Sequence, residues 1–364
     1  MRSVRDIPIY ENIPIVVRAA LNVPVENGVV INDYRLRRAL PTIRFLAERG
    51  ARVVLIGHLG EKGTETLKPV AEALGALLTG VSFFEETIGA RARAAVRNLT
   101  PGNILVMENL RRDRGERMND RVFAEALAEL GDVFVEDCFD TCHRSHASII
   151  GIPKILPSYA GLLLEEEVRE LSRAQTPKST SLAVIGGAKF STKEAVLTTL
   201  LKTYDHVFVG GALANDFLKV AGRSVGRSLL SETTNTDDIK KLLMNTKLIL
   251  PIDSVIKNEV ILDHGPNTIA FLSDLAREAK TILWNGPLGN YENGFTSATE
   301  SFARAVAVSN AYSVVGGGDT IAAIEGLGLL ARFSFVSTGG GAMLHFLATG
   351  TLPGIEALGL YSRN

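Results

Sequence analysis

Residues 314–323 are Val314-Val315-Gly316-Gly317-Gly318-Asp319-Thr320-Ile321-Ala322-Ala323. A β-branched run passes through three glycines and an aspartate into small apolar residues, so we predict a strand that leads directly into a helix. The first turn of a helix has unpaired N–H groups and a partial positive charge, and glycine lets a phosphate approach the backbone. Asp319 adds a carboxylate that suits Mg2+. The alternative is a tight turn in which Asp319 only caps the helix.

Three further glycine turns follow short apolar segments in the same half of the chain. They are Gly186-Gly187-Ala188-Lys189, Gly210-Gly211-Ala212 and Gly339-Gly340-Gly341-Ala342. Four glycine-rich strand ends that face one crevice favour a nucleotide site over four coincidental turns. Lys189 and Lys193 lie four residues apart where a helix is predicted, hence on one helical face, where both would contact phosphate groups. An ordinary solvated lysine pair is the alternative.

Length and composition predict two domains. The chain has 364 residues, whereas single hydrophobic cores stop growing near ~250 to 300 residues, so we expect two domains with a cleft between them. Lys and Arg number 39 and Asp and Glu 40, which leaves no overall basic field for nucleic acid. No apolar run approaches the ~18 residues of a membrane span, and residues 1–11 contain no apolar signal core. We therefore expect a cytoplasmic protein without a nucleic-acid or membrane partner.

Strand and helix patterns alternate along the chain, as they do in parallel sheets covered by helices. We predict strands at 13–20, 53–57, 81–84, 104–107, 133–137, 182–185, 207–209, 248–250 and 281–284. We predict helices at 41–49, 67–78, 90–98, 120–130, 159–173, 191–203, 212–220, 267–278 and 297–308. Pro41 suits the first turn of the first of these helices. The predicted fold is α/β, with two doubly wound, Rossmann-like parallel-sheet domains over 1–158 and 177–349 and a connecting helix over 159–176.

Basic and polar residues gather at the predicted strand ends of the first half. They are Arg18, Asn22, Arg35, His58, Arg111, His143, Arg144 and His146. The carboxyl ends of parallel strands share one edge of the sheet, so arginines far apart in the sequence would converge on one anion. The alternative is a set of scattered surface arginines.

A further loop follows the strand predicted at 281–284. It contains Asn285-Gly286-Pro287 and then Glu292, whose carboxylate would accept hydrogen bonds from ribose hydroxyls. A plain surface turn is the alternative.

Nine motifs together resemble the phosphoglycerate kinase family over nearly the whole chain, and they occur in the family's order. They are Asn22-Val23-Pro24, Ala39-Leu40-Pro41-Thr42-Ile43, His58-Leu59-Gly60, Glu108-Asn109-Leu110-Arg111, His143-Arg144-Ser145-His146, Gly186-Gly187-Ala188-Lys189, Trp284-Asn285-Gly286-Pro287, Gly316-Gly317-Gly318-Asp319-Thr320 and Ser337-Thr338-Gly339-Gly340-Gly341-Ala342. The resemblance implies reversible phosphoryl transfer between 1,3-bisphosphoglycerate and ADP, which gives 3-phosphoglycerate and ATP. It also implies a monomer that needs Mg2+, closes about a hinge, and packs residues 350–364 back on its first, acceptor-binding domain.

Site residues follow from the same resemblance, position by position. The implied 3-phosphoglycerate site is Arg18, Asn22, Arg35, His58, Arg111, His143 and Arg144. The implied ATP or ADP site is Lys189, Lys193, Asn285, Glu292, Gly316, Gly317, Gly318, Asp319 and Thr320, with Asp319 as the Mg2+ ligand. The implied catalytic residues are Lys189, Arg18, Gly317 and Gly318. Transfer between a carboxylate and ADP needs alignment and positive charge more than covalent help.

Several positions depart from the family pattern, and most of them fall in the first half. They are Ala20, Glu61, Glu136, Asp140, Thr192 and His345. Ala20 replaces an aspartate and Glu61 an arginine, so the acceptor is less firmly implied than the nucleotide. Two alternatives therefore remain open at this point: a kinase of the same fold that acts on another carboxylate, and a nucleotide-binding relative without turnover.

Overall fold

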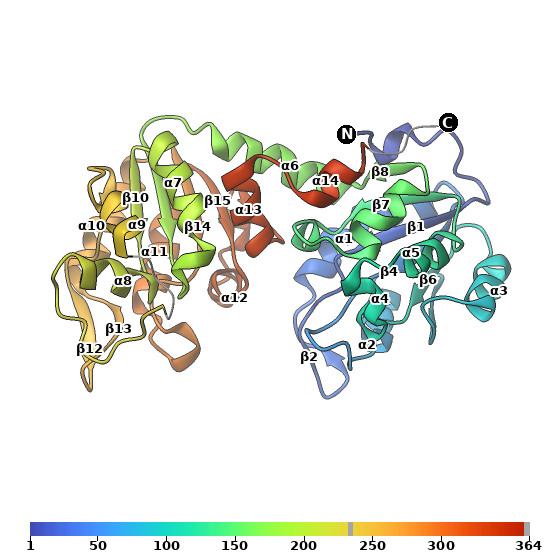
Figure 1. Ribbon diagram of the computed structural model, residues 1–364, viewed down its shortest axis with the longest axis horizontal. Coiled ribbons are helices and arrows are strands. Elements are labelled where there is room, and N and C mark those ends of the chain that lie inside the picture. The colour runs from blue at the N-terminus through green and yellow to red at the C-terminus, as the bar shows by residue number, and fades with distance from the viewer. Residues whose placement is uncertain (232–235, 360–364) are drawn as a thin grey trace. The chain divides into compact units, whose positions relative to one another are not determined.

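The computed structural model describes residues 1–231 and 236–359, which divide into two compact units. Unit 1 comprises Met1–Val168 together with residues 351–359, and unit 2 comprises Arg169–Gly350. Each unit contains one six-stranded parallel sheet with helices on both faces (Figure 1). The predicted doubly wound α/β fold is confirmed. No helix in the described part of the chain is long and apolar enough to cross a membrane.

The sheet of unit 1 has the order β5-β6-β4-β1-β7-β8, and all its pairs are parallel. Its strands are β1 (Pro14–Ala19), β4 (Arg52–Ile56), β5 (Val81–Phe84), β6 (Ile104–Met107), β7 (Val133–Asp137) and β8 (Ser158–Ala160). The chain adds strands on one side of β1 and then returns to its other side with β7. Ligands bind where the strand order reverses in this way, at the carboxyl ends of the strands. In unit 1 that point lies between β1 and β7.

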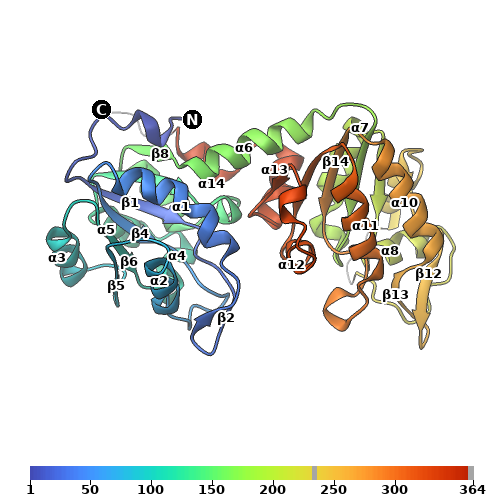
Figure 2. The same cartoon turned by 180° about the vertical axis from the view of Figure 1, so that it is seen from behind.

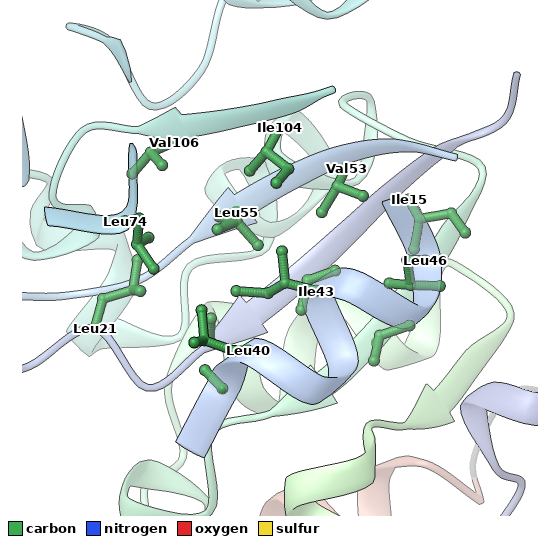
Figure 3. Packing of buried hydrophobic residues seen from close by; sticks show 14 of the residues in the cluster. Ile15, Leu21, Leu40, Ile43, Leu46, Val53, Leu55, Leu74, Ile104 and Val106 are labelled. Carbon is green, nitrogen blue, oxygen red and sulfur yellow. The ribbon is translucent and has the colours of Figure 1, made fainter. Parts of the chain in front are cut away.

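Alternate strand residues of unit 1 fill two hydrophobic cores, one on each face of the sheet. Val53 and Leu55 point into the core under α1 (Tyr34–Ala47) and α2 (Lys68–Gly75), which Figure 3 shows. Their neighbours in the strand, including Val54, point into the opposite core under α3 (Ala90–Asn98) and α5 (Arg121–Ala128). A strand buried on both faces needs a continuous apolar run, which explains the sequences of β1, β4 and β6.

The first helix begins earlier than predicted. It runs from Tyr34 to Ala47, so Pro41 lies inside it and not in its first turn. A proline in a helix interior removes one N–H donor and costs ~3 kcal/mol. Leu36, Ile43 and Leu46 lie on one face of this helix and are completely buried against the sheet. Because a fully buried aliphatic side chain contributes about 1.5–3 kcal/mol, this face offsets the cost of the proline.

The sheet of unit 2 has the order β11-β10-β9-β14-β15-β16 and is also parallel throughout. Its strands are β9 (Ser181–Ile185), β10 (His206–Val209), β11 (Leu248–Ile249), β14 (Thr281–Asn285), β15 (Tyr312–Gly316) and β16 (Phe335–Val336). Helix α7 (Glu194–Thr203) covers the face seen in Figure 1, and α10 (Pro266–Glu278) and α11 (Ser297–Val308) cover the face seen in Figure 2. The order reverses between β9 and β14.

Two of the remaining helices, α8 (Leu213–Val220) and α12 (Gly318–Gly326), are among those that the sequence patterns predicted. The patterns did not predict the pair β2 (Val25–Glu26) and β3 (Val29–Val30), α4 (Arg114–Met118), α9 (Thr236–Leu243), the hairpin β12 (Ser254–Lys257) and β13 (Val260–His264), α13 (Gly341–Thr349) and α14 (Pro353–Ala357). Strand β8 was also missed, because its three residues fall at the edge of the helical pattern predicted from residue 159.

The boundary between the two units falls within α6 (Leu162–Gln175). This helix starts on Asp137, whose Oδ1 accepts the backbone N–H groups of Leu163 at 3.0 Å and Leu164 at 3.2 Å. Helix α14 belongs to unit 1, where the Gly354 N–H donates to the carbonyl of Cys142 at 2.9 Å. Residues 360–364, which we expected to pack on the first domain as well, lie outside the described residues.

Candidate functional site

Glycine turns from five strands meet at the carboxyl edge of the sheet in unit 2. The Gly186 N–H donates to the Asn285 carbonyl at 2.8 Å, and the Gly187 N–H donates to the Pro287 carbonyl at 3.3 Å. A Cβ atom on Gly186 would lie 2.2 Å from the Pro287 oxygen, so no larger residue fits there. The same holds for Gly211, whose Cβ would lie 2.8 Å from the Gly187 nitrogen. The turns after β9, β10 and β14 therefore form one continuous backbone surface.

The stretch at 314–323 folds as predicted, from β15 directly into α12. Gly317 has a φ of 102°, which strongly favours glycine. A Cβ atom there would lie 3.4 Å from the Gly286 nitrogen, and one on Gly340 would lie 3.5 Å from the Gly317 Cα. The first turn of α12 and the turn after β16 thus join the same surface. Unpaired N–H groups at this helix start make it suited to a phosphate.

A pocket of ≈ 370 Å³ opens beside these turns, entirely within unit 2. Glu292 and Asp319 line it, together with Gly187 and Gly211. One wall is formed by residues 260–264 of β13, which the sequence patterns did not single out. The sequence does contain a sign of this hairpin, because two apolar runs flank Asn258-Glu259. In the structure both of these residues have positive φ angles, as in a two-residue hairpin turn. Glutamate in place of the usual glycine concealed that turn.

His264 lies at the end of β13 on the wall of the pocket. Its ring is buried and stands edge-on to Phe208, with centroids 5.5 Å apart. Burial lowers the pKa of His264 to about 4. The ring is therefore neutral at pH 7, with Nε2 accepting the Gly211 N–H at 3.3 Å. In this form His264 supports the turn after β10 from behind.

The prediction that Lys189 and Lys193 lie on one face of an α-helix is wrong. The two lysines flank a single 3-10 turn at Phe190–Thr192. The turn is closed by the Thr192 hydroxyl, which donates to the Lys189 carbonyl at 3.0 Å. Lys189 is exposed, whereas Lys193 is half-buried and its pKa is lowered by that burial. The Lys193 Nζ lies 3.5 Å from where a Cβ on Gly187 would be. It therefore lies over the turn that follows β9.

Asn285 and Thr320 complete the predicted nucleotide-binding set. Asn285 is buried, and its Nδ2 lies 3.5 Å from a Cβ position on Gly316, beside the first turn of α12. The Thr320 Oγ1 is buried next to Gly317 and has no hydrogen-bond partner among the described residues. A buried hydroxyl without a partner is costly, so its place at a helix start is consistent with a ligand that would satisfy it.

In unit 1 the predicted basic patch does form, but Arg18 lies behind it. The Arg18 side chain is completely buried and its guanidinium donates to the chain itself. The acceptors are Ser148 Oγ at 3.1 Å, the Ala19 carbonyl at 3.0 Å, Cys138 Sγ at 3.3 Å and His58 Nδ1 at 2.9 Å. The Ser148 hydroxyl in turn donates to Glu116 at 2.6 Å. Arg18 is thus the centre of a buried network between β1, β4 and β7.

Asn22, Arg35 and Arg111 lie at the surface of the patch. Arg35 donates to the Asn22 carbonyl at 2.7 Å, and the Asn22 Oδ1 accepts the Gly60 N–H at 3.0 Å. Arg111 donates to the Gly60 carbonyl at 2.6 Å. Asn22, Arg35 and Gly60 line a pocket of ≈ 300 Å³. Three segments distant in sequence therefore share one small surface, which carries the charge of Arg35 and also that of Glu65.

The histidines of the patch show that the arginines converge. Burial lowers the pKa of His58 well below its usual value, and Arg18 and Arg111 lower it further. Burial also lowers the pKa of His146 to about 4, again with help from Arg111, Arg18 and Arg144. Both rings are neutral at pH 7, and both experience the same positive field. His143, half-buried, and Arg144, exposed, follow β7 in the same loop.

Comparisons with known proteins agree with this architecture. A family profile described as "Phosphoglycerate kinase" matches residues 4–350. The chain belongs to the phosphoglycerate kinase family. It is 41% identical to the phosphoglycerate kinase of Pelotomaculum thermopropionicum over an alignment of 389 positions, gaps included, with 98% of each chain covered. For the phosphoglycerate kinase of Xanthobacter flavus the identity is 41% over 378 positions, with 94% of this chain and 95% of the relative covered.

Solved phosphoglycerate kinase structures have the same fold. The structure from Coxiella burnetii matches with a TM-score of 0.82 and 39% identity and covers 98% of both chains. The structure from Pyrococcus horikoshii matches with a TM-score of 0.89 and 30% identity and covers 99% of both. The family resemblance found in the nine motifs is therefore confirmed over nearly the whole chain.

Four of the six departures from the family pattern, all except Thr192 and His345, lie in unit 1, and several of them surround Arg18 and the patch. Ala20 is buried against Cys138 on the same side of the sheet as Arg18. Glu136 is completely buried beside Arg18, and burial raises the pKa of Glu136 well above its usual value. Glu61 is exposed, and its carboxylate raises the pKa of Arg111, although burial and Arg18 lower that pKa by more. The patch thus contains carboxylates as well as arginines.

Proposed function

We propose that the chain is a magnesium-dependent kinase of glycolysis and gluconeogenesis. It transfers a phosphoryl group reversibly between 1,3-bisphosphoglycerate and ADP, which yields 3-phosphoglycerate and ATP. The observation that supports this proposal is a pocket at the carboxyl edge of each sheet, beside glycine turns in unit 2 and beside Arg35 in unit 1, in a member of the phosphoglycerate kinase family. A patch of guanidinium groups suits a phosphorylated carboxylate, and glycine turns with a pocket suit a nucleotide.

The acceptor is assigned to unit 1. Arg35, Arg111 and Arg144 bind its phosphate and Asn22 and His143 its remaining polar groups. Arginine is preferred here because its planar fork of donors matches a phosphate and its charge does not depend on pH. His58 supports this site from behind. We assign Arg18 to positioning, because its donors already contact groups of the chain.

The nucleotide is assigned to unit 2. Its base occupies the pocket next to β13, and Glu292 on the pocket wall accepts from the ribose hydroxyls. Its phosphates bind the backbone N–H groups of residues 316–320, with Asn285, Lys193 and the Thr320 hydroxyl as further donors. Burial of Lys193 strengthens its attraction to a phosphate, because water screens the charge less there.

Magnesium fits the donors present. Asp319 presents a carboxylate on the wall of the pocket, and within the described residues no group of three or more metal-ligating side chains exists. Mg2+ is typically held by one or two carboxylates together with substrate phosphates and water, which this arrangement allows. Asp319 would therefore hold the ion with the nucleotide, and the ion would neutralise phosphate charge.

The chemistry requires little beyond alignment and charge. The bond from the acceptor's carboxyl oxygen to phosphorus breaks as the bond from phosphorus to the terminal ADP oxygen forms, so no proton needs to move. Lys189, with the backbone N–H groups of Gly317 and Gly318, stabilises the negative charge on the phosphoryl group in transit. We propose that the enzyme closes about a hinge to exclude water, and that it acts as a cytoplasmic monomer.

A substrate panel tests this proposal. ATP consumption with Mg2+ is measured with 3-phosphoglycerate and with related carboxylates that carry or lack a phosphate. We expect kcat/KM for 3-phosphoglycerate to exceed that of every other acceptor by at least tenfold, about 1.4 kcal/mol of discrimination. A higher value for another carboxylate would support the same-fold alternative. ATP binding without consumption with any acceptor would support the non-catalytic one.

A further inference from the structure

Asp140 places a buried carboxylate inside the basic patch of unit 1. It lies in the 3-10 turn Phe139–Thr141 that follows β7, and its side chain is only 7% exposed. One oxygen, Oδ2, lies 3.7 Å from Arg35 Nη1. The other, Oδ1, accepts from Cys138 Sγ at 2.8 Å and lies 3.4 Å from the Thr141 hydroxyl. These contacts hold the carboxylate in place next to the arginine.

Arg35 is the residue through which this carboxylate reaches the acceptor site. Its side chain is 27% exposed and lines the ≈ 300 Å³ pocket beside Asn22 and Gly60. Its Nη1 already donates to the Asn22 carbonyl and faces Asp140. An anion that enters the pocket therefore meets an arginine whose charge is partly compensated by the protein.

We propose that Asp140 is a specificity-determining residue of the acceptor site, where it competes with the bound anion for Arg35 and thereby weakens acceptor binding. The proposal rests on the function proposed above. A carboxylate 3.7 Å from Arg35 Nη1 offsets the charge of this guanidinium, so a phosphate or carboxylate that binds Arg35 is attracted less strongly than it would be by an unpaired arginine. A small anion that contacts Arg35 alone loses most of its affinity. A phosphorylated carboxylate that also contacts Arg111 and Arg144 retains enough affinity to bind.

Asp140→Asn tests the proposal, because the amide keeps the shape of the side chain and removes only its charge. Binding of 3-phosphoglycerate and of inorganic phosphate is measured by titration calorimetry with the full chain at low and at high salt. We expect Asp140→Asn to bind 3-phosphoglycerate about tenfold more tightly at low salt, and the gain to shrink at high salt, where charges are screened. The affinity of Asp140→Asn for inorganic phosphate should rise by at least the same factor.

Asp132→Asn is the matched control. Asp132 is exposed and precedes β7, so it lies at the opposite end of the strand that Asp140 follows. Its replacement removes the same charge from unit 1, but roughly 16 Å away from the position of Asp140, which is beyond the Debye length at physiological salt. The control should change the Kd for 3-phosphoglycerate by less than about twofold.

A double-mutant cycle with Arg35→Gln identifies the mechanism. If Asp140 acts through Arg35, Asp140→Asn should change affinity by less than about twofold in the Arg35→Gln background. A gain of the same size in both backgrounds would refute competition for Arg35. Should Asp140→Asn not fold, Asp140→Gly removes the same charge and is subject to the same expectations.

The measurements distinguish a failure of this inference from a failure of the proposed function. Unchanged or weaker 3-phosphoglycerate binding by folded Asp140→Asn, with normal binding by the wild type, would refute this inference alone. A wild-type chain that does not bind 3-phosphoglycerate at all would refute the proposed function, and this inference with it.

Discussion

Replacing Arg18 tests whether this residue holds unit 1 together or contacts the acceptor. We consider Arg18→Met, which keeps an apolar side chain of similar length and removes the guanidinium. The four contacts that Arg18 donates are all buried. At about 1 kcal/mol net for each hydrogen bond, their loss costs about 4 kcal/mol.

Such a loss is a large fraction of the ~5–15 kcal/mol that stabilises a typical protein. Urea unfolding followed by circular dichroism should show Arg18→Met unfolding at a clearly lower urea concentration than the wild type. Hydrogen exchange should place the loss of protection in β1 and β7 of unit 1. The control is Arg97→Met in α3, where the arginine is exposed. This control should change the free energy of unfolding by less than about 0.5 kcal/mol.

One result would refute the reasoning. If Arg18→Met unfolds like the wild type but no longer binds 3-phosphoglycerate, Arg18 is a substrate ligand, as the family resemblance alone implies. The buried network would then be a property of the unliganded site that rearranges when the acceptor binds.

Three further predictions concern unit 2. Lys189→Ala should lower kcat by at least about a hundredfold with little change in nucleotide Kd, because the lysine charge acts on the phosphoryl group in transit. Steady-state kinetics and nucleotide titration check this, and an equal loss in kcat and in nucleotide affinity would indicate a ground-state contact. Asp319→Ala should weaken Mg-ATP binding and leave 3-phosphoglycerate binding to unit 1 intact, and calorimetry showing the reverse would overturn the assignment of ligands to units. His264, neutral when buried, should lower stability in acid: its pKa is about 4 in the fold and ~6.5 when unfolded, so unfolding takes up a proton below pH 6.5. Between pH 7 and 4 the free energy of unfolding should fall by about 3 kcal/mol more in the wild type than in His264→Asn; equal slopes in urea titrations would contradict this.

Local sequence patterns predicted the frame of the nucleotide site because that frame is made of backbone. Glycine turns such as Gly186-Gly187 follow apolar strands, and a parallel sheet brings all such turns to one edge. The close approach of Gly211 to Gly187, and that of Gly317 to Gly286, follow from that rule with no side chains involved. Lys189 and Lys193 show what this rule about strand ends does not predict. Whether a turn continues as an α-helix or as one 3-10 turn depends on local hydrogen bonds such as the one from Thr192.

The depth of Arg18 could not be predicted, because strand position does not specify what packs over a side chain. Its partners Ser148, Cys138 and His58 come from segments 40 to 130 residues away. From the sequence, Arg18 and Arg35 look alike as arginines near one strand end. The structure separates them: one is covered by the loop after β7, and the other lines a pocket.

In the proposed function the two units bind anions through different groups, and this has a consequence for pH dependence. The proposed donors are largely backbone N–H groups and lysines in unit 2 and guanidinium groups in unit 1. His58 and His146 in unit 1 contribute no charge at neutral pH, since burial and the neighbouring arginines lower the pKa of His146 to about 4 and that of His58 well below its usual range. Arginine does not titrate in proteins. The charge of these groups is therefore constant from about pH 5 upward, whereas burial raises the pKa of Glu136, beside Arg18, well above its usual value. A change in acceptor affinity near neutral pH then reflects ionisation of the acceptor's own phosphate or of carboxyl groups such as Glu136, and not of these arginines and histidines.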